Sequence, residues 1–109
     1  FADVAYVNRS AGAAVFRSGN VDQATLNVGI STGPSKYTMA YKVNDFAASR
    51  DGGAVVTDLS GALPVNPIRL AVGSTPWGMD GGNSISGHVR RILYYPIRLD
   101  NARLKEATT

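Results

Sequence analysis

The chain has 109 residues, carries a formal net charge of +3 and contains no cysteine. This length corresponds to one domain at most, and the lack of cysteine excludes a disulfide framework and a thiolate metal site. No apolar run reaches the roughly 18 residues of a membrane-spanning helix, so we expect no membrane segment. The basic residues are largely scattered and no RNP-type aromatic sequence accompanies them, so we expect no nucleic-acid partner either.

The first 43 residues predict short strands separated by turns. Residues 4–7 and 13–17 are apolar-rich and flank a polar turn, which is typical of a hairpin. After a second turn at 18–20, apolar and polar residues alternate over 24–30, as in a half-buried strand. Residues 37–43 alternate in the same way and predict a strand with its bulky side inward.

The middle of the chain predicts another hairpin. Asp51-Gly52 separates two short extended runs, 46–50 and 54–57, and this dipeptide is among the strongest short-range hairpin signals. A loop with glycine and proline follows over 58–67. Residues 68–73 then predict a strand.

The C-terminal part begins with GHVRRILYYP, in which both faces of an extended chain carry apolar residues. Residues 89–95 therefore predict a strand in the centre of a sheet, covered on both faces. Pro96 ends this strand because proline cannot donate to a ladder.

Asp100 follows as a suitable N-cap for one short helix, near residues 101–107. Such a helix is marginal by itself in water and has to dock to persist. The residues that lie near one side of this helix are Leu99, Ala102, Arg103 and Ala107.

About seven or eight short strands and one terminal helix are typical of an all-β fold. We expect residues 1–109 to form a single antiparallel β-sandwich or jelly roll, with the short helix at its C-terminal end.

The ending GHVRRILYYPIRLDNARLKEATT resembles the C-terminal signature of concanavalin A-like, or laminin-G-like, jelly-roll domains in bacteriophage tail and other virion proteins. Asp100 departs from the usual Ser or Thr but caps a helix equally well. The resemblance extends upstream to about Lys36. The matching positions are Gly87, Arg90, Arg91, Tyr94, Tyr95, Pro96, Arg98, Leu99, Asn101, Ala102, Leu104 and Thr108.

This resemblance implies a concanavalin-like jelly roll, and a complete domain of that type is longer, so we expect the chain to be the C-terminal part of a larger chain or domain. It also implies a phage tail-fibre or capsid-fibre module located in the virion, outside the cell. Proteins of one fold have many functions, so we weigh two. The first is a lectin that recognises a cell-surface glycan. The alternative is a non-catalytic structural module that holds virion subunits together.

Trp77, Asp80 and Asn83 lie in one irregular stretch and are the candidate glycan-binding residues. An indole on a loop offers a flat apolar face for a sugar ring, and the two polar side chains can hydrogen-bond ring hydroxyls. The alternative is that Trp77 folds back as a lid over the core.

We expect no enzyme activity and no catalytic residues from this chain alone. Retaining glycosidases need two carboxyl groups about 5 Å apart, but the only glutamate is Glu106 and no two aspartates are spaced along one strand. His88, the only histidine, has no partner that the sequence identifies. We expect no cofactor; calcium is the alternative, held by Asp58 and Asp80 with backbone and water oxygens.

The predicted strands either divide into two minimal sheets or form half of a larger sandwich. In the second case apolar faces would stay partly exposed and would drive association. We therefore expect a homo-oligomer, or pairing with the preceding part of its own chain. The residues that would carry these faces are Leu26, Val28, Met39, Tyr41, Leu70, Val72 and Leu93.

Overall fold

The computed structural model describes residues 4–8, 12–30, 33–64 and 89–109, which form two antiparallel sheets and one helix. In the first sheet the order is β1-β2-β3, and in the second it is β4-β5-β6. The elements are β1 (Val4–Asn8), β2 (Ala13–Ser18), β3 (Val21–Asn27), β4 (Tyr37–Lys42), β5 (Asp45–Arg50), β6 (Val56–Asp58) and α1 (Asn101–Ala107). The predicted strand at 68–73 lies outside the described residues.

Local turn chemistry explains the hairpins, and the predictions based on it are confirmed. Gly19 and Asn20, between β2 and β3, both have positive φ, at 60° and 64°. Asp51 and Gly52, between β5 and β6, do as well, at 49° and 73°. Two successive positive φ angles give the turn twist that matches antiparallel strands. Each sheet is therefore a meander whose sequence neighbours pair.

The main core lies between the two sheets. The first sheet contributes Phe16 and Leu26, and the second contributes Phe46 and Ala48. The Phe16 ring is 5.0 Å from that of Phe46, centroid to centroid, in a tilted arrangement that aromatic pairs favour. Leu26, which a half-sandwich would leave exposed, is 1% exposed, so the faces of the described sheets cover each other.

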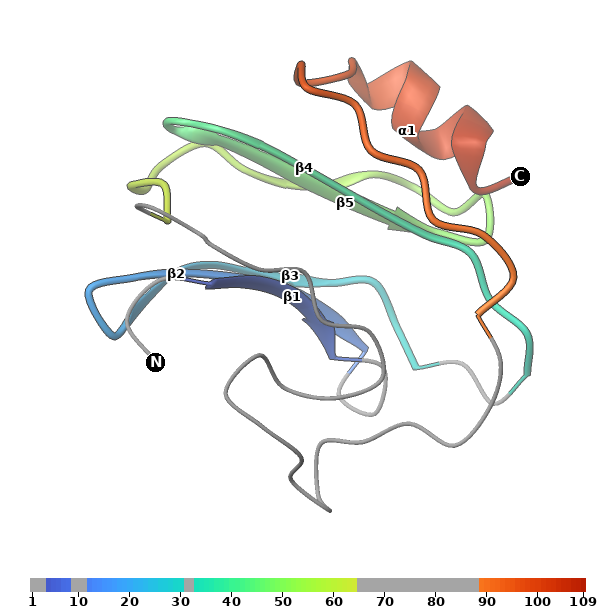
Figure 1. The fold of residues 1–109 in the computed structure, drawn as a ribbon, viewed down its shortest axis with the longest axis horizontal. Helices are drawn as coiled ribbons and strands as arrows, with labels where there is room; N and C mark the ends of the chain where they lie inside the picture. Colours follow the sequence, from blue (N-terminus) through green and yellow to red (C-terminus); the bar gives the residue numbers. More distant parts are fainter. Residues whose placement is uncertain (1–3, 9–11, 31–32, 65–88) are drawn as a thin grey trace.

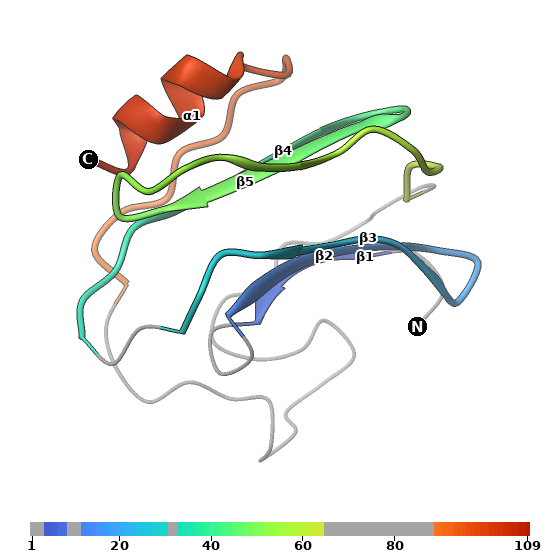
Figure 2. The same ribbon diagram turned by 180° about the vertical axis from the view of Figure 1, so that it is seen from behind.

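Helix α1 forms a third layer on the outer face of the second sheet (Figures 1 and 2). Leu104 packs there against Ala40 and Ala47. The second sheet is therefore covered on both faces, and four consecutive residues of β5, its central strand, are buried.

The sequence makes two predictions about faces, of which the structure confirms and extends the first and corrects the second. Residues 37–43 do turn Met39 and the Tyr41 ring toward the main core, but the opposite face of β4, at Ala40, is buried under the helix as well. In α1 the buried residue is Leu104, whereas Ala102 and Ala107 are exposed. A helix of seven residues carries too few apolar positions for its pattern to specify the docking face.

A second correction concerns residues 89–95. The sequence predicts a central strand, but in the structure these residues form neither strand nor helix. Alternation shows that these residues suit a strand, but a strand forms only where a neighbouring strand is present to pair with it. The fold is all-β with one short helix, and the described strands form two packed sheets.

Candidate functional site

Residues 89–97, which we call the 89–97 segment, present an exposed run of large apolar side chains. No backbone–backbone hydrogen bond joins this segment to another described residue. Exposed contiguous apolar surface of this kind marks interaction sites in soluble proteins. The side chains are between 49% and 82% exposed and belong to Val89, Ile92, Leu93, Tyr94, Tyr95 and Ile97.

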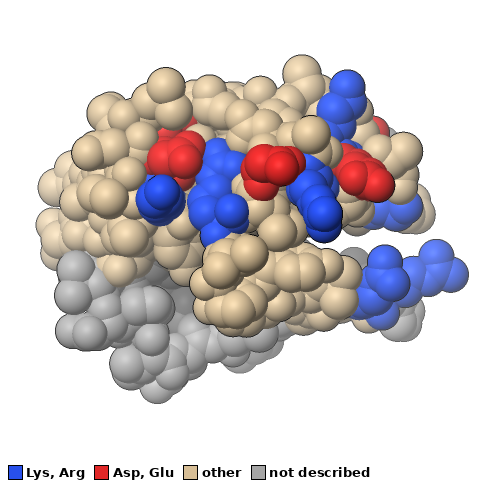
Figure 3. Space-filling model, turned by 90° about the horizontal axis from the view of Figure 1, so that it is seen from above, with Lys and Arg blue, Asp and Glu red and all other residues tan. Residues whose placement is uncertain are grey.

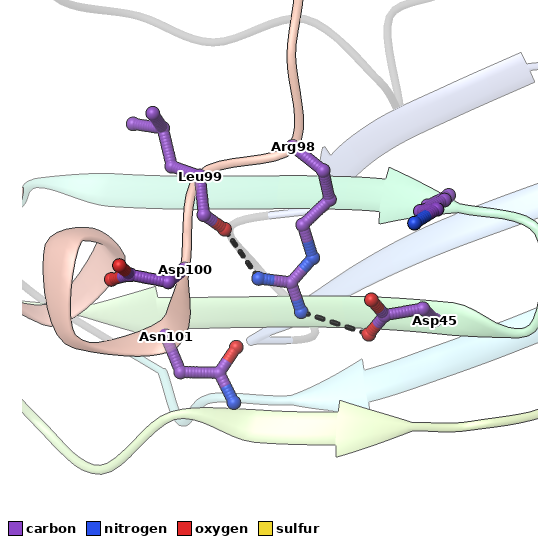
Figure 4. Close-up of a pocket in the computed structure, with 6 residues that line it drawn as sticks. Asp45, Arg98, Leu99, Asp100 and Asn101 are labelled. Carbon is purple, nitrogen blue, oxygen red and sulfur yellow. Dashed lines mark hydrogen bonds and ion pairs between the residues drawn. The ribbon is translucent and has the colours of Figure 1, made fainter.

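The end of the segment is fixed by Arg98. Its side chain is only 12% exposed and one guanidinium nitrogen lies 3.0 Å from a carboxylate oxygen of Asp45, at the start of β5. A second nitrogen donates to the backbone carbonyl of Leu99 (Figure 4). A guanidinium holds several acceptors in one fixed plane. The segment therefore leaves the second sheet from a defined point.

Beside this ion pair lies a shallow hollow of about 350 Å³. Figure 4 shows Asp45, Arg98 and the residues at the start of α1 around it. Arg98 and Asp45 bind each other, and the Asp100 carboxylate accepts the Arg103 amide at 2.9 Å as the helix N-cap. Pockets for small molecules are mostly apolar and enclosed. Three polar residues of this open hollow, Asp45, Arg98 and Asp100, are engaged in holding the chain together. Its lining residues are Lys42, Asp45, Arg98, Leu99, Asp100 and Asn101.

The other end of α1 is also tied to the second sheet. The hydroxyl of Thr108, which is 2% exposed, accepts the Gly52 amide at 2.9 Å and donates to the Lys105 carbonyl. The Thr38 hydroxyl donates to the Leu104 carbonyl at 3.2 Å. Residues 98–108, which include α1, therefore contact both the start of β5, through Arg98 and Asp45, and the turn after it, through Thr108 and Gly52. The 89–97 segment is attached to a well-anchored layer.

The charges on the helix side of the molecule are mixed. Figure 3 shows acidic and basic side chains interspersed on this face rather than gathered by sign. A nucleic-acid interface depends on a concentrated basic surface, and this face does not provide one.

The structure describes only some of the candidate residues that the sequence predicts. Trp77, Asp80 and Asn83 all lie outside the described residues, as does His88. Asp58 is described, and its carboxylate accepts the Ser60 amide and hydroxyl in a local turn. Among the described residues no group of three or more His, Cys, Asp or Glu side chains comes together. Glu106 is exposed on α1.

Two residues that organise this region, Arg98 and Thr108, appear in the sequence analysis only as motif positions, without a structural role. Arg98 stands in the C-terminal motif, but nothing in the sequence connects it to Asp45, 53 residues away. Thr108 ends the helix and gives no signal that its hydroxyl binds the Asp51-Gly52 turn. Both residues make contacts with distant parts of the chain, and the periodicity of the sequence does not predict such contacts.

Searches with family models, among curated proteins and among solved structures found no match for this chain. Within the described part of the chain, no helix is long and apolar enough to cross a membrane.

Proposed function

We propose that this chain is a non-catalytic assembly module of a virion protein, and that the 89–97 segment is its contact with other subunits. The observation that carries the proposal is the exposure of six large apolar side chains in nine successive residues, with Tyr94 at 82% and Ile97 at 71%. A small domain with a closed core does not need this exposure for its own stability. Burial in a subunit contact would remove it from water.

The composition of the segment also suits a protein contact. Tyr and Arg are enriched in the buried centres of interfaces, and the segment carries Tyr94 and Tyr95 beside Arg90 and Arg91. Guanidinium groups can stack on phenol rings. The virion assignment rests on the C-terminal motif, and with it we propose a jelly-roll arrangement for the sheets.

A light-scattering comparison tests the assembly proposal. The wild-type chain should exceed the monomer mass at micromolar concentration, and Leu93→Ser should return it toward 11.5 kDa. Leu59→Ser is the matched control because Leu59 is 71% exposed in the loop after β6, away from the segment. A monomeric wild-type chain, or equal effects of the two variants, would contradict the proposal.

Glycan binding is our second proposal. It is supported by the sequence after Trp77, in which Asp80 and Asn83 follow three and six positions later and supply polar groups beside an aromatic residue. A glycan array probed with the full chain tests it. Binding that disappears in Trp77→Ala, while the melting transition is unchanged, would support a lectin, and a blank array would reject one.

A further inference from the structure

The 89–97 segment has apolar side chains on both faces of an extended chain. In residues 89–95, Val89, Leu93 and Tyr95 share one face by period-two alternation, and Ile92 and Tyr94 share the other. A half-covered sheet would leave one of these faces in water. The pattern therefore fits a sheet that is covered on both sides.

The second sheet is covered on both sides. The first sheet lies over one face, at Phe46 and Ala48, and α1 lies over the other, at Ala40 and Ala47. A strand added at the edge of this sheet would have one face beside the first sheet and the other face beside α1.

Strand β4 offers such an edge. Within the part of the chain that the structure describes, β4 pairs with β5 on one side and has no strand on the other. An edge strand with free amide and carbonyl groups is a template for another strand. β4 is six residues long, whereas β6 at the opposite edge has three, so β4 supports the longer ladder.

The direction of the chain argues for a segment from another copy. Arg98 binds Asp45, and Asp45 is paired with Lys42 at the C-terminal end of β4. The chain's own segment, ending at Arg98, would therefore lie parallel to β4. Antiparallel pairing, which is slightly more stable per residue, requires a segment that enters from the opposite direction.

We infer that residues 89–95 of one copy add as an antiparallel strand to the β4 edge of a second copy, and that the exchange is reciprocal. A twofold axis makes the two contacts identical and closes the assembly as a dimer. In each copy the described strands β4, β5 and β6 gain a further strand beside β4. This inference rests on the proposed function and specifies the partner as the chain itself.

Intermolecular paramagnetic broadening tests this pairing without assuming a register. The chain has no native cysteine, so Lys42→Cys on β4 can carry a single nitroxide. One preparation carries the nitroxide and no nitrogen-15. It is mixed with a second preparation that carries nitrogen-15 and no nitroxide, so any broadening seen comes from another copy. Thr25→Cys, exposed on β3 of the first sheet, is the matched control.

We expect the amide signals of residues 89–95 to broaden strongly with the nitroxide at position 42, and much less with the nitroxide at position 25. If the chain is dimeric but broadening of this segment is absent, or is equal from the two labels, the β4 pairing is wrong although the assembly function stands. A chain that stays monomeric at the concentration used overturns both.

Discussion

At the scale of single residues, Arg98 joins the exposed segment to the second sheet. Arg98→Ala leaves the Asp45 carboxylate, which is 38% exposed, without its partner. Because that carboxylate still reaches water, we expect a loss of only about 1 kcal/mol in the free energy of unfolding. Urea denaturation measures the loss.

Arg17→Ala is the control for this prediction, because the Arg17–Asp22 pair is more exposed, at 29% and 53%. Its cost should be smaller, within about 0.5 kcal/mol of zero. An Arg17 effect as large as the Arg98 effect would show that the Arg98 contact is an ordinary surface pair.

Gly12 and Gly19 give a second matched pair at this scale. Both have positive φ, at 68° and 60°. A Cβ at Gly12 would lie 2.5 Å from the carbonyl carbon of Gly29, whereas a Cβ at Gly19 meets nothing within 4 Å. Gly19→Ala should cost about 1–2 kcal/mol from the left-handed conformation alone. Gly12→Ala should cost roughly a further 1–3 kcal/mol because backbone has to move. Thermal denaturation of both variants decides this, and equal losses would contradict the close approach.

At the scale of elements, α1 depends on docking rather than on its own helical tendency. It has seven residues, and isolated helices of that length are unstable in water. Leu104→Ala removes its buried apolar side chain, so we expect a loss of about 2–3 kcal/mol and a smaller helical signal in circular dichroism. Glu106→Ala, on the exposed side, should change little. Retention of the helix in Leu104→Ala would show that another contact holds it.

The elements also show what the sequence can and cannot predict. Asp51-Gly52 and Ser18-Gly19-Asn20 specify hairpins locally, so β2, β3, β5 and β6 follow from short stretches. The Asp100 cap likewise identifies the start of α1, since its carboxylate binds an amide three residues later. The 89–95 stretch has equally regular alternation but no adjacent turn that pairs it. Alternation identifies residues suited to a strand, and a neighbouring strand decides whether one forms.

At the scale of the whole molecule, the candidate site depends on contacts that cross the chain. The packing of the sheets follows from alternation, because the alternate apolar side chains, such as Phe16 and Leu26, are stabilised by burial against a second apolar face. The third layer does not, because the Arg98–Asp45 pair and the Thr108–Gly52 contact join residues more than 50 positions apart. Only the folded chain shows that the 89–97 segment is fixed at one end on the second sheet.

The central claim is that the 89–97 segment is covered by association, and amide hydrogen exchange at two protein concentrations tests it most directly. In dilute solution, where monomer dominates, the amides of residues 89–95 and 97 should exchange fast, because no described backbone carbonyl accepts a hydrogen bond from them. At concentrations where light scattering shows assembly, amides within residues 89–95 should become protected, and pairing with β4 as an added edge strand would protect alternate amides. Exchange that stays equally fast while the chain assembles, with protection appearing only elsewhere, would contradict the account.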